Sequence, residues 1–120
     1  MLNVQNINVY YGNIQAIRDI SFSVEDGEIV TLIGANGAGK STILKSVSGL
    51  LRSKTGDITF DGKSIKSTAP HKIVAQGLAH VPEGRRVFLQ MSVEENLEMG
   101  AFTAPRATIE DSITNVYERF

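Results

Sequence analysis

The sequence of 120 residues predicts an α/β fold in which a strand leads into a phosphate-binding loop and a helix follows the loop. Residues 34–41 are G-A-N-G-A-G-K-S, which matches the G-x-x-x-x-G-K-[ST] pattern of loops that wrap phosphate groups. An apolar run, residues 29–33, comes directly before this loop, and residues 41–49 after it have helical spacing. A strand before the loop and a helix after it are the context that the pattern requires.

The first thirty residues predict strands and turns. Apolar residues alternate roughly through 2–9, and Tyr10-Tyr11-Gly12-Asn13 ends this run as a turn. Apolar and polar residues alternate over 20–25, as in a half-buried strand. Asp26-Gly27 is a hairpin signal, and the run 29–33 is apolar almost throughout. We expect residues 29–33 to form a strand buried on both faces, as in a parallel sheet covered by helices.

The segments after the loop alternate between helix and strand patterns. The helix over 41–49 is expected to end at Gly49, and residues 57–66 predict a hairpin around Asp61-Gly62. Pro70 suits the first turn of a short helix that Gly77 ends. A short strand is then expected over 78–81.

The last forty residues predict a loop and two helices. Residues 82–90 have the pattern of a loop, and Ser92-Val93-Glu94-Glu95 is a capping box that opens a helix ending at Gly100. The final helix is expected to have one apolar face, formed by Ile109, Ile113, Val116, Tyr117 and Phe120.

Composition sets limits on the class of protein. The chain is 42% hydrophobic with a formal net charge of −1, which gives no electrostatic reason to expect a nucleic-acid partner. It contains no cysteine, so it forms no disulfide. No apolar run approaches the ~20 residues of a membrane span, and the first residues do not form a signal peptide. We therefore expect a soluble cytoplasmic protein without a direct membrane span.

The residue types of the loop suit the binding of a triphosphate. Successive backbone N–H groups at the positive end of a helix bind a triphosphate, and glycines at 34, 37 and 39 allow close approach. Lys40 is placed to reach the β- and γ-phosphates, and the Ser41 hydroxyl is placed to ligate Mg²⁺. Thr42 can donate to the α-phosphate. The predicted phosphate-binding residues are Gly34, Asn36, Gly37, Ala38, Gly39, Lys40, Ser41 and Thr42.

Five further segments flank this loop in a recognisable order. They are Tyr11-Gly12-x4-Ile17-Arg18-Asp19-Ile20-Ser21-Phe22, Gly27-Glu28-Ile29-Val30, Ser41-Thr42-Ile43-Leu44-Lys45 with Gly49-Leu50, Gly56-Asp57-Ile58-x-Phe60-Asp61-Gly62, and Val93-Glu94-Glu95-Asn96-Leu97. With the loop, they resemble the ATP-binding subunit of an ABC transporter over essentially the whole chain. The stretch 80–88, H-V-P-E-G-R-R-V-F, resembles the subunits that drive uptake of branched-chain amino acids.

The resemblance implies a fold and a domain organisation. The fold is a P-loop NTPase core of the ABC ATPase type with an N-terminal antiparallel β subdomain, truncated at the start of the helical subdomain. Residues 1–120 are then the N-terminal part of one nucleotide-binding domain. Its phosphate loop is 34–42, its coupling loop is about 82–91, and its helical subdomain starts at about 92–120.

The resemblance also implies roles for residues outside the loop. Tyr11 matches the aromatic residue that stacks on adenine, with Tyr10 as the neighbouring alternative. Glu83 stands where most relatives carry a glutamine that senses Mg²⁺ and the γ-phosphate, and a carboxylate suits that cation. Arg85 and Arg86 either bind acidic groups of a partner or solvate the loop. The implied cofactors are ATP and Mg²⁺.

Several features of the family do not occur in this sequence. A Leu-Ser-Gly-Gly signature, an apolar strand ending in Asp-Glu and a late switch histidine are missing, and His80 is expected to be a packing residue. The intact protein that the resemblance implies is an ATP hydrolase, dimeric with a second ATPase subunit and held at the cytoplasmic face of the membrane by transmembrane permease subunits. The 120-residue chain has no catalytic residue of its own and should bind ATP weakly without hydrolysing it.

Three alternatives remain open from the sequence. The first is a non-transport ABC ATPase, which the loop after Glu83 would distinguish, because transport subunits use this region to grip a membrane partner. The second is a short nucleotide-binding module without catalysis. The third is a phosphotransferase of the P-loop class, which would leave Tyr11 and the matching flanks unexplained.

Overall fold

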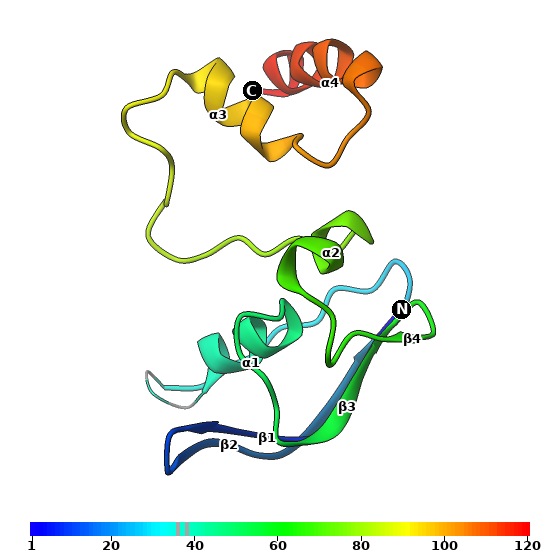
Figure 1. Cartoon of the computed structure of the whole chain (residues 1–120), viewed down its shortest axis with the longest axis vertical. Coiled ribbons are helices and arrows are strands. Elements are labelled where there is room, and N and C mark those ends of the chain that lie inside the picture. The colour runs from blue at the N-terminus through cyan, green and yellow to red at the C-terminus, as the bar shows by residue number, and fades with distance from the viewer. Residues whose placement is uncertain (36, 38) are drawn as a thin grey trace. The chain divides into compact units, whose positions relative to one another are not determined.

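A computed structural model describes residues 1–35, 37 and 39–120. The chain divides into two compact units, Met1–His80 and Val81–Phe120. The first unit contains strands β1 (Leu2–Tyr11), β2 (Ile14–Val24), β3 (Thr55–Phe60) and β4 (Lys63–Ser64) with helices α1 (Lys40–Val47) and α2 (Pro70–Ala75) (Figure 1). The second unit contains α3 (Val93–Gly100) and α4 (Arg106–Arg119).

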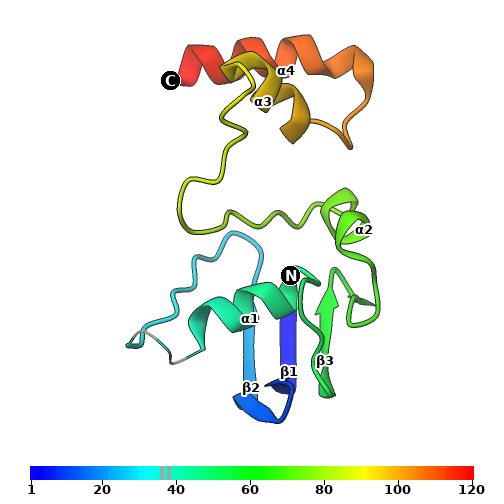
Figure 2. The same cartoon turned by 60° about the vertical axis from the view of Figure 1, so that its left-hand side comes forward.

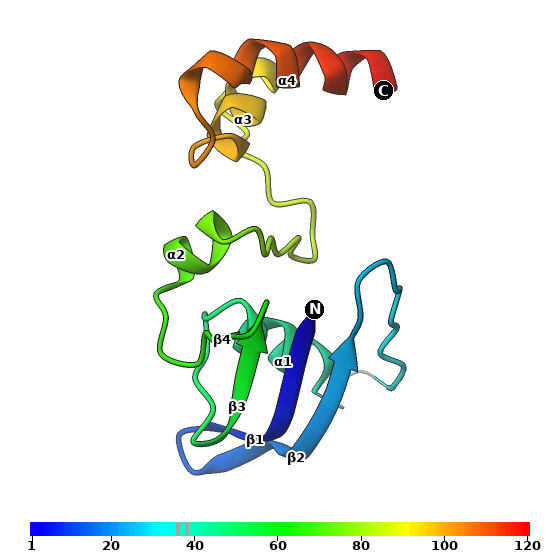
Figure 3. The same ribbon diagram turned by 90° about the vertical axis from the view of Figure 1, so that its right-hand side faces the viewer.

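The sheet of the first unit has the order β2-β1-β3-β4, and every pair is antiparallel. Strand β1 is central, with Val4 opposite both Phe22 of β2 and Ile58 of β3. Figure 3 shows these three strands side by side. The turn between β3 and β4 has positive φ at both central residues, 49° at Asp61 and 81° at Gly62, as the predicted Asp-Gly hairpin requires.

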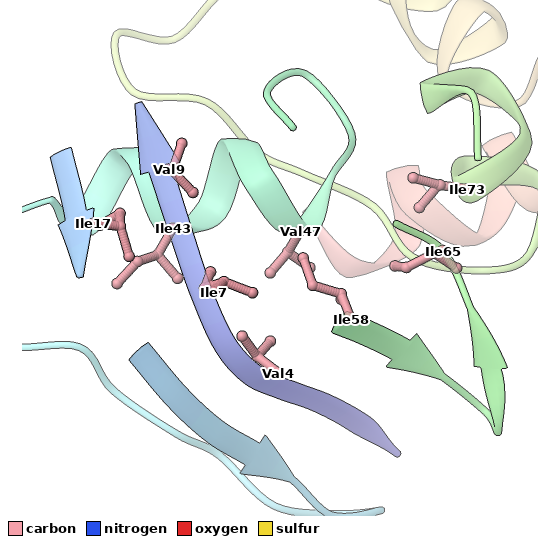
Figure 4. Packing of buried hydrophobic residues seen from close by; sticks show 9 residues of the cluster. All are labelled: Val4, Ile7, Val9, Ile17, Ile43, Val47, Ile58, Ile65 and Ile73. Carbon is pink, nitrogen blue, oxygen red and sulfur yellow. The ribbon is translucent and has the colours of Figure 1, made fainter. Parts of the chain in front are cut away.

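The core of this unit lies between one face of the sheet and α1 (Figure 2). The buried residues of β1 face α1, with a shift of the strand register between Val4 and Ile7, and Ile43 and Val47 lie one helical turn apart on α1, so the two apolar surfaces meet. Figure 4 shows the buried side chains converging from the strands, α1 and α2. They are Val4, Ile7, Val9, Ile17, Ile43, Val47, Ile58, Ile65 and Ile73.

The predicted helix ends in this unit are confirmed. Helix α1 ends before Gly49, which has a φ of 85°, and the Leu50 N–H donates to the Lys45 carbonyl at 2.9 Å. This is the bond that closes a Schellman motif. Pro70 is the first residue of α2, and Gly77, with a φ of 104°, follows its end. Glycine accepts these angles without steric cost.

Two predicted strands are wrong. Residues 29–33 form no strand, and Ile29 and Ile33 are 92% and 95% exposed. Asp26-Gly27 makes a turn, with Glu28 N–H donating to Glu25 at 3.1 Å, but no hairpin follows it. Residues 78–81 also form no strand. A strand buried on both faces needs neighbours for its backbone groups, and no described strand pairs with either segment.

The second unit begins with the predicted loop and capping box. The Ser92 hydroxyl accepts from the Glu95 N–H at 3.1 Å, and the Glu95 carboxylate accepts from the Ser92 N–H at 3.2 Å. These two bonds satisfy N–H groups at the start of α3, which ends at Gly100 as predicted. On α4, the predicted apolar face is half-buried at Ile109, Ile113 and Val116 and exposed at Tyr117 and Phe120.

The amino group of Met1 ties two turns of the first unit together. It donates to Asp61 at 2.8 Å and to Asp26 at 3.0 Å, and these bonds, that to Asp61 foremost, raise the pKa of the amine above 8.0. The charged amine is favoured in the folded state, so its stabilisation is complete below pH 8 and is lost as pH rises through the raised pKa. All three groups are exposed, so the contribution to stability is small.

This pairing gives a direct prediction for the 120-residue chain. An NMR titration of the Met1 amine should give a pKa above 8.0, and Asp61→Asn should move that pKa down towards 8.0. Asp111→Asn, on an exposed turn of α4, serves as the control and should leave it unchanged. A pKa at or below 8.0 in the unsubstituted chain would contradict the ion pair.

Candidate functional site

Gly39 fixes the start of α1 against the sheet. It is the residue before the helix and has a φ of 100°. A Cβ at this position would lie 2.5 Å from Cδ1 of Ile17 and 3.3 Å from the Ala16 carbonyl oxygen, both on β2. A Cβ would require Ile17 to shift and would be strained by the left-handed backbone angle, so the position favours glycine. The amino end of α1 is therefore held directly beside the first residues of β2.

The amino end of α1 presents donors that the helix itself does not use. The first bond of the helix runs from the Ile43 N–H to the Gly39 carbonyl at 2.9 Å, and the amides of Lys40, Ser41 and Thr42 precede it. Together with the helix dipole, these groups favour an anion. These donors suit a phosphate group, and phosphate binding at this end of α1 stays a prediction from the loop pattern.

An open hollow of about 430 Å³ lies over this helix end. The predicted residues that line it are Tyr11, Gly37, Gly39, Lys40, Ser41 and Thr42. The Tyr11 hydroxyl shares a hydrogen bond of 3.1 Å with Oγ1 of Thr42, which joins the end of β1 to the first turn of α1. Tyr11 is 46% exposed, which leaves part of the side chain accessible from the hollow.

Lys40 and Ser41 differ in their surroundings. The Lys40 ammonium donates to the Gly34 carbonyl at the opposite end of the loop, so its side chain spans the loop. The Ser41 side chain is exposed on the wall of the hollow, where a hydroxyl oxygen could ligate a hard cation such as Mg²⁺. Asn36 and Ala38, the other two predicted loop residues, lie outside the described residues.

Tyr10, the alternative to Tyr11, is in a different environment. The Lys54 ammonium lies 4.4 Å from the centroid of its ring, and Tyr10 is not among the residues that line the hollow. Adjacent residues of a strand point to opposite faces, so only one of the two tyrosines can face α1. Tyr11 is the one that does.

Glu83 lies in the exposed loop at the start of the second unit. Its carbonyl accepts from Nε of Arg86 at 3.2 Å, and both Arg85 and Arg86 are exposed. In the part of the chain that the structure describes, no three acidic or histidine side chains gather as a metal site. A contact between Glu83 and Mg²⁺ therefore stays a prediction from the resemblance.

His80 packs inside the first unit. Its Nδ1 lies 3.4 Å from the Ser48 hydroxyl, at the carboxyl end of α1, and its side chain is half-buried. The hydrogen bond gives His80 the packing role that was predicted for it.

Three residues of the hollow escaped the sequence analysis. Ile14, Gln15 and Ala16 line it because the β1–β2 hairpin places Ile14 opposite Tyr11. The signal that could have found them is the turn at Gly12-Asn13, which folds the next residues back beside Tyr11.

Comparison with known proteins finds a matching family model and relatives whose names agree with that family. A family model described as ABC transporter matches residues 17–120. The high-affinity branched-chain amino acid transport ATP-binding protein BraG of Pseudomonas aeruginosa is 44% identical over the whole chain, which covers 52% of that protein. The probable branched-chain amino acid transport ATP-binding protein LivF of Archaeoglobus fulgidus is 32% identical over the whole chain, which covers 51% of it.

Solved structures agree with the fold. One described as the ATP binding subunit of an ABC transporter superposes with a TM-score of 0.80 at 32% identity, covering 92% of this chain and 46% of the other. The chain thus spans about half the length of the relatives that it matches. No helix among the described residues is long and apolar enough to cross a bilayer.

Proposed function

The chain belongs to the ABC transporter family, and from this premise we propose that it is the ATP-binding part of a subunit that powers an importer of branched-chain amino acids. The relatives named for branched-chain amino acids support the substrate, because two of them align with the whole chain. A relative named for ribose import also aligns with 97% of the chain, at 32% identity, so the 44% identity to the branched-chain amino acid protein of Pseudomonas aeruginosa is what favours this substrate.

One observation supports ATP as the ligand above all others: the hollow joins Tyr11 to Lys40, Ser41 and Thr42 at the amino end of α1. An aromatic ring can stack on adenine, helix amides and an ammonium suit the phosphates, and the Ser41 hydroxyl suits Mg²⁺. In this proposal Lys40 binds the β- and γ-phosphates, and Thr42 donates to the α-phosphate.

The remaining roles belong to the same proposal. Residues 1–120 are the N-terminal part of one nucleotide-binding domain, with 82–91 as its coupling loop and 92–120 as the start of its helical subdomain. Glu83 senses the Mg²⁺-bound nucleotide. The whole protein hydrolyses ATP at an interface with a second ATPase subunit, and permease subunits hold it at the cytoplasmic face of the membrane. The 120-residue chain binds ATP without hydrolysing it.

The stacking role of Tyr11 leads to a prediction. Tyr11→Ala should weaken Mg-ATP binding by ~1–2 kcal/mol, about 5- to 30-fold, because the ring is lost. Tyr11→Phe keeps the ring and should stay within about twofold of the unsubstituted chain. Tyr10→Ala is the matched control and should leave the affinity unchanged. Calorimetric titration of the unsubstituted chain and the three variants measures the affinities. If only Tyr10→Ala weakens binding, the adenine stacks on Tyr10 and not on Tyr11.

Uptake measurements test the importer and its substrate. Disrupting the coding sequence in the source organism should abolish high-affinity uptake of labelled leucine, isoleucine and valine, while ribose uptake should not change. Restoring the gene should restore uptake, and restoring it with Lys40→Ala should not. Unchanged uptake of all solutes would favour a non-transport ABC ATPase, and loss of ribose uptake alone would contradict the proposed substrate.

A further inference from the structure

The side chain of Asn96, on α3, makes four hydrogen bonds to the loop before that helix. Its Oδ1 accepts from the Phe88 N–H at 2.9 Å, and its Nδ2 donates to the Phe88 carbonyl at 3.1 Å. Nδ2 also donates to the carbonyls of Ser92 at 2.9 Å and Met91 at 3.3 Å. The two N–H groups of Nδ2 serve three carbonyls, so one N–H is shared between two of them, while Oδ1 is the acceptor for the fourth bond.

The hydrogen bonds of Asn96 hold residues 88–92 against α3. The two bonds to Phe88 satisfy both backbone groups of that residue, as a neighbouring strand would do. The capping box between Ser92 and Glu95 closes the other end of the same segment. The loop therefore cannot leave α3 at Phe88 unless the Asn96 bonds break.

The residues before Phe88 connect the segment 88–92 to Glu83. The Val87 N–H donates to the Arg85 carbonyl at 2.8 Å, and Nε of Arg86 donates to the Glu83 carbonyl at 3.2 Å. Four residues lie between Glu83 and Phe88, so a loop held at Phe88 also limits the positions that Glu83 can take.

The hydrogen bonds between Asn96 and Phe88 join the two walls of a hollow of about 500 Å³ in the second unit. Arg86, Val87 and Phe88 supply one wall, and α3 supplies the other through Asn96, Leu97, Met99 and Gly100. The lining is mainly apolar, and Phe88 is 56% exposed. A group that contacts one wall acts on the other, because Asn96 bonds across them.

We propose that Asn96 is a positioning residue that fastens the loop carrying Glu83 to α3, so that loop and helix respond together when a permease partner contacts this hollow. The proposal rests on the proposed function for the partner, and on the four hydrogen bonds for the clamp. Asn96 contacts the loop backbone and acts on nucleotide chemistry only through Glu83.

Hydrogen exchange tests the clamp in the 120-residue chain, without nucleotide or partner. Asn96→Ala should speed exchange of the Phe88 amide about tenfold or more, because its acceptor is lost. Asn96→Asp loses the Nδ2 donor and places a second oxygen against the Phe88, Met91 and Ser92 carbonyls, so it should also speed this exchange. Glu98→Ala, exposed on the same helix, is the control and should match the unsubstituted chain.

The outcomes decide the clamp. Unchanged exchange of Phe88 in Asn96→Ala overturns it. If alanine also exposes the amides of α3, the aspartate variant decides, because an acidic residue near the start of a helix favours that helix. Fast exchange at Phe88 with α3 still protected supports the clamp, and slow exchange at Phe88 overturns it.

Hydrolysis by the full-length protein with its permease tests the positioning role. Asn96→Ala should lower the partner-stimulated rate about tenfold, and should leave the KM for ATP and the unstimulated rate within about twofold. Asn96→Asp, which removes the three bonds from Nδ2, should lower the stimulation as well. Equal loss of both rates, or full stimulation, overturns the role of Asn96. Failure of the proposed function would appear differently, as no hydrolysis by the unsubstituted protein, and hydrogen exchange would still test the clamp.

Discussion

Replacing Lys40 by alanine is expected to lower the affinity of the chain for Mg-ATP by at least ~100-fold. The ammonium belongs to the wall of the hollow and is the only described cationic group in that lining. Hydrogen bonds to charged groups contribute about 1.5–3 kcal/mol each, and Lys40 is expected to reach two phosphates, so the loss is at least ~3 kcal/mol. Calorimetric titration with Mg-ATP measures it.

Lys45→Ala is the matched control for this experiment. Lys45 lies on the same helix, one turn and a half further along, and its side chain is exposed. The substitution removes the same charge from α1 without touching the hollow, so the affinity should stay within about twofold. Circular dichroism of both variants checks that α1 is retained. Equal affinities of the two variants would contradict the phosphate-binding role of Lys40.

The largest expected effect on stability belongs to Gly56. This glycine in β3 has a φ of 83°, and a Cβ there would overlap the carbonyl oxygens of Gln5 and Asn6 on β1. Backbone atoms of a central strand cannot move aside as a flexible side chain can. Gly56→Ala should therefore disturb the β1–β3 ladder and lower the free energy of unfolding by at least ~3 kcal/mol.

Gly62→Ala separates the overlap from the backbone angle. Gly62 has nearly the same φ, 81°, and nothing lies within 4 Å of the position of its Cβ. Only the conformational cost of a left-handed residue applies, about 1–2 kcal/mol. Urea denaturation of both variants gives the comparison. A loss at Gly56 no greater than that at Gly62 would show that β1 accommodates the Cβ.

Elements with a local cause could be predicted from the sequence. Gly49 and Gly77 end helices because glycine accepts a positive φ, and the Ser92 capping box needs only residues within one helical turn. The Asp61-Gly62 turn likewise depends on its own two residues. In each case the interaction that decides the structure lies within a few residues of the signal.

The strands at 29–33 and 78–81 could not be predicted in the same way. Their apolar character indicates burial, but whether a segment forms a strand depends on partners far away in the sequence. In the described residues the sheet contains only β1 to β4, so these runs have no ladder to join. Ile29 and Ile33 are exposed for that reason.

The candidate site was predictable in part for a related reason. The loop pattern fixes Lys40 and Ser41 at the amino end of a helix, because both lie within the motif itself. The hydrogen bond between Tyr11 and Thr42 joins residues 31 apart, and only the packing of α1 on the sheet brings them together. The Asn96 contacts gave no signal, because they go to backbone groups, which almost any residue at 88, 91 and 92 would present.

The most direct test of the central claim is an NMR titration of the isotope-labelled chain with Mg-ATP. The proposal predicts that the amide shifts concentrate at Gly37 and residues 39–42, with the Tyr11 ring shifted as well, and that adenosine alone shifts the ring but not the loop. Shifts absent from residues 39–42 at saturating Mg-ATP, or centred elsewhere in the chain, would contradict a nucleotide site at the amino end of α1.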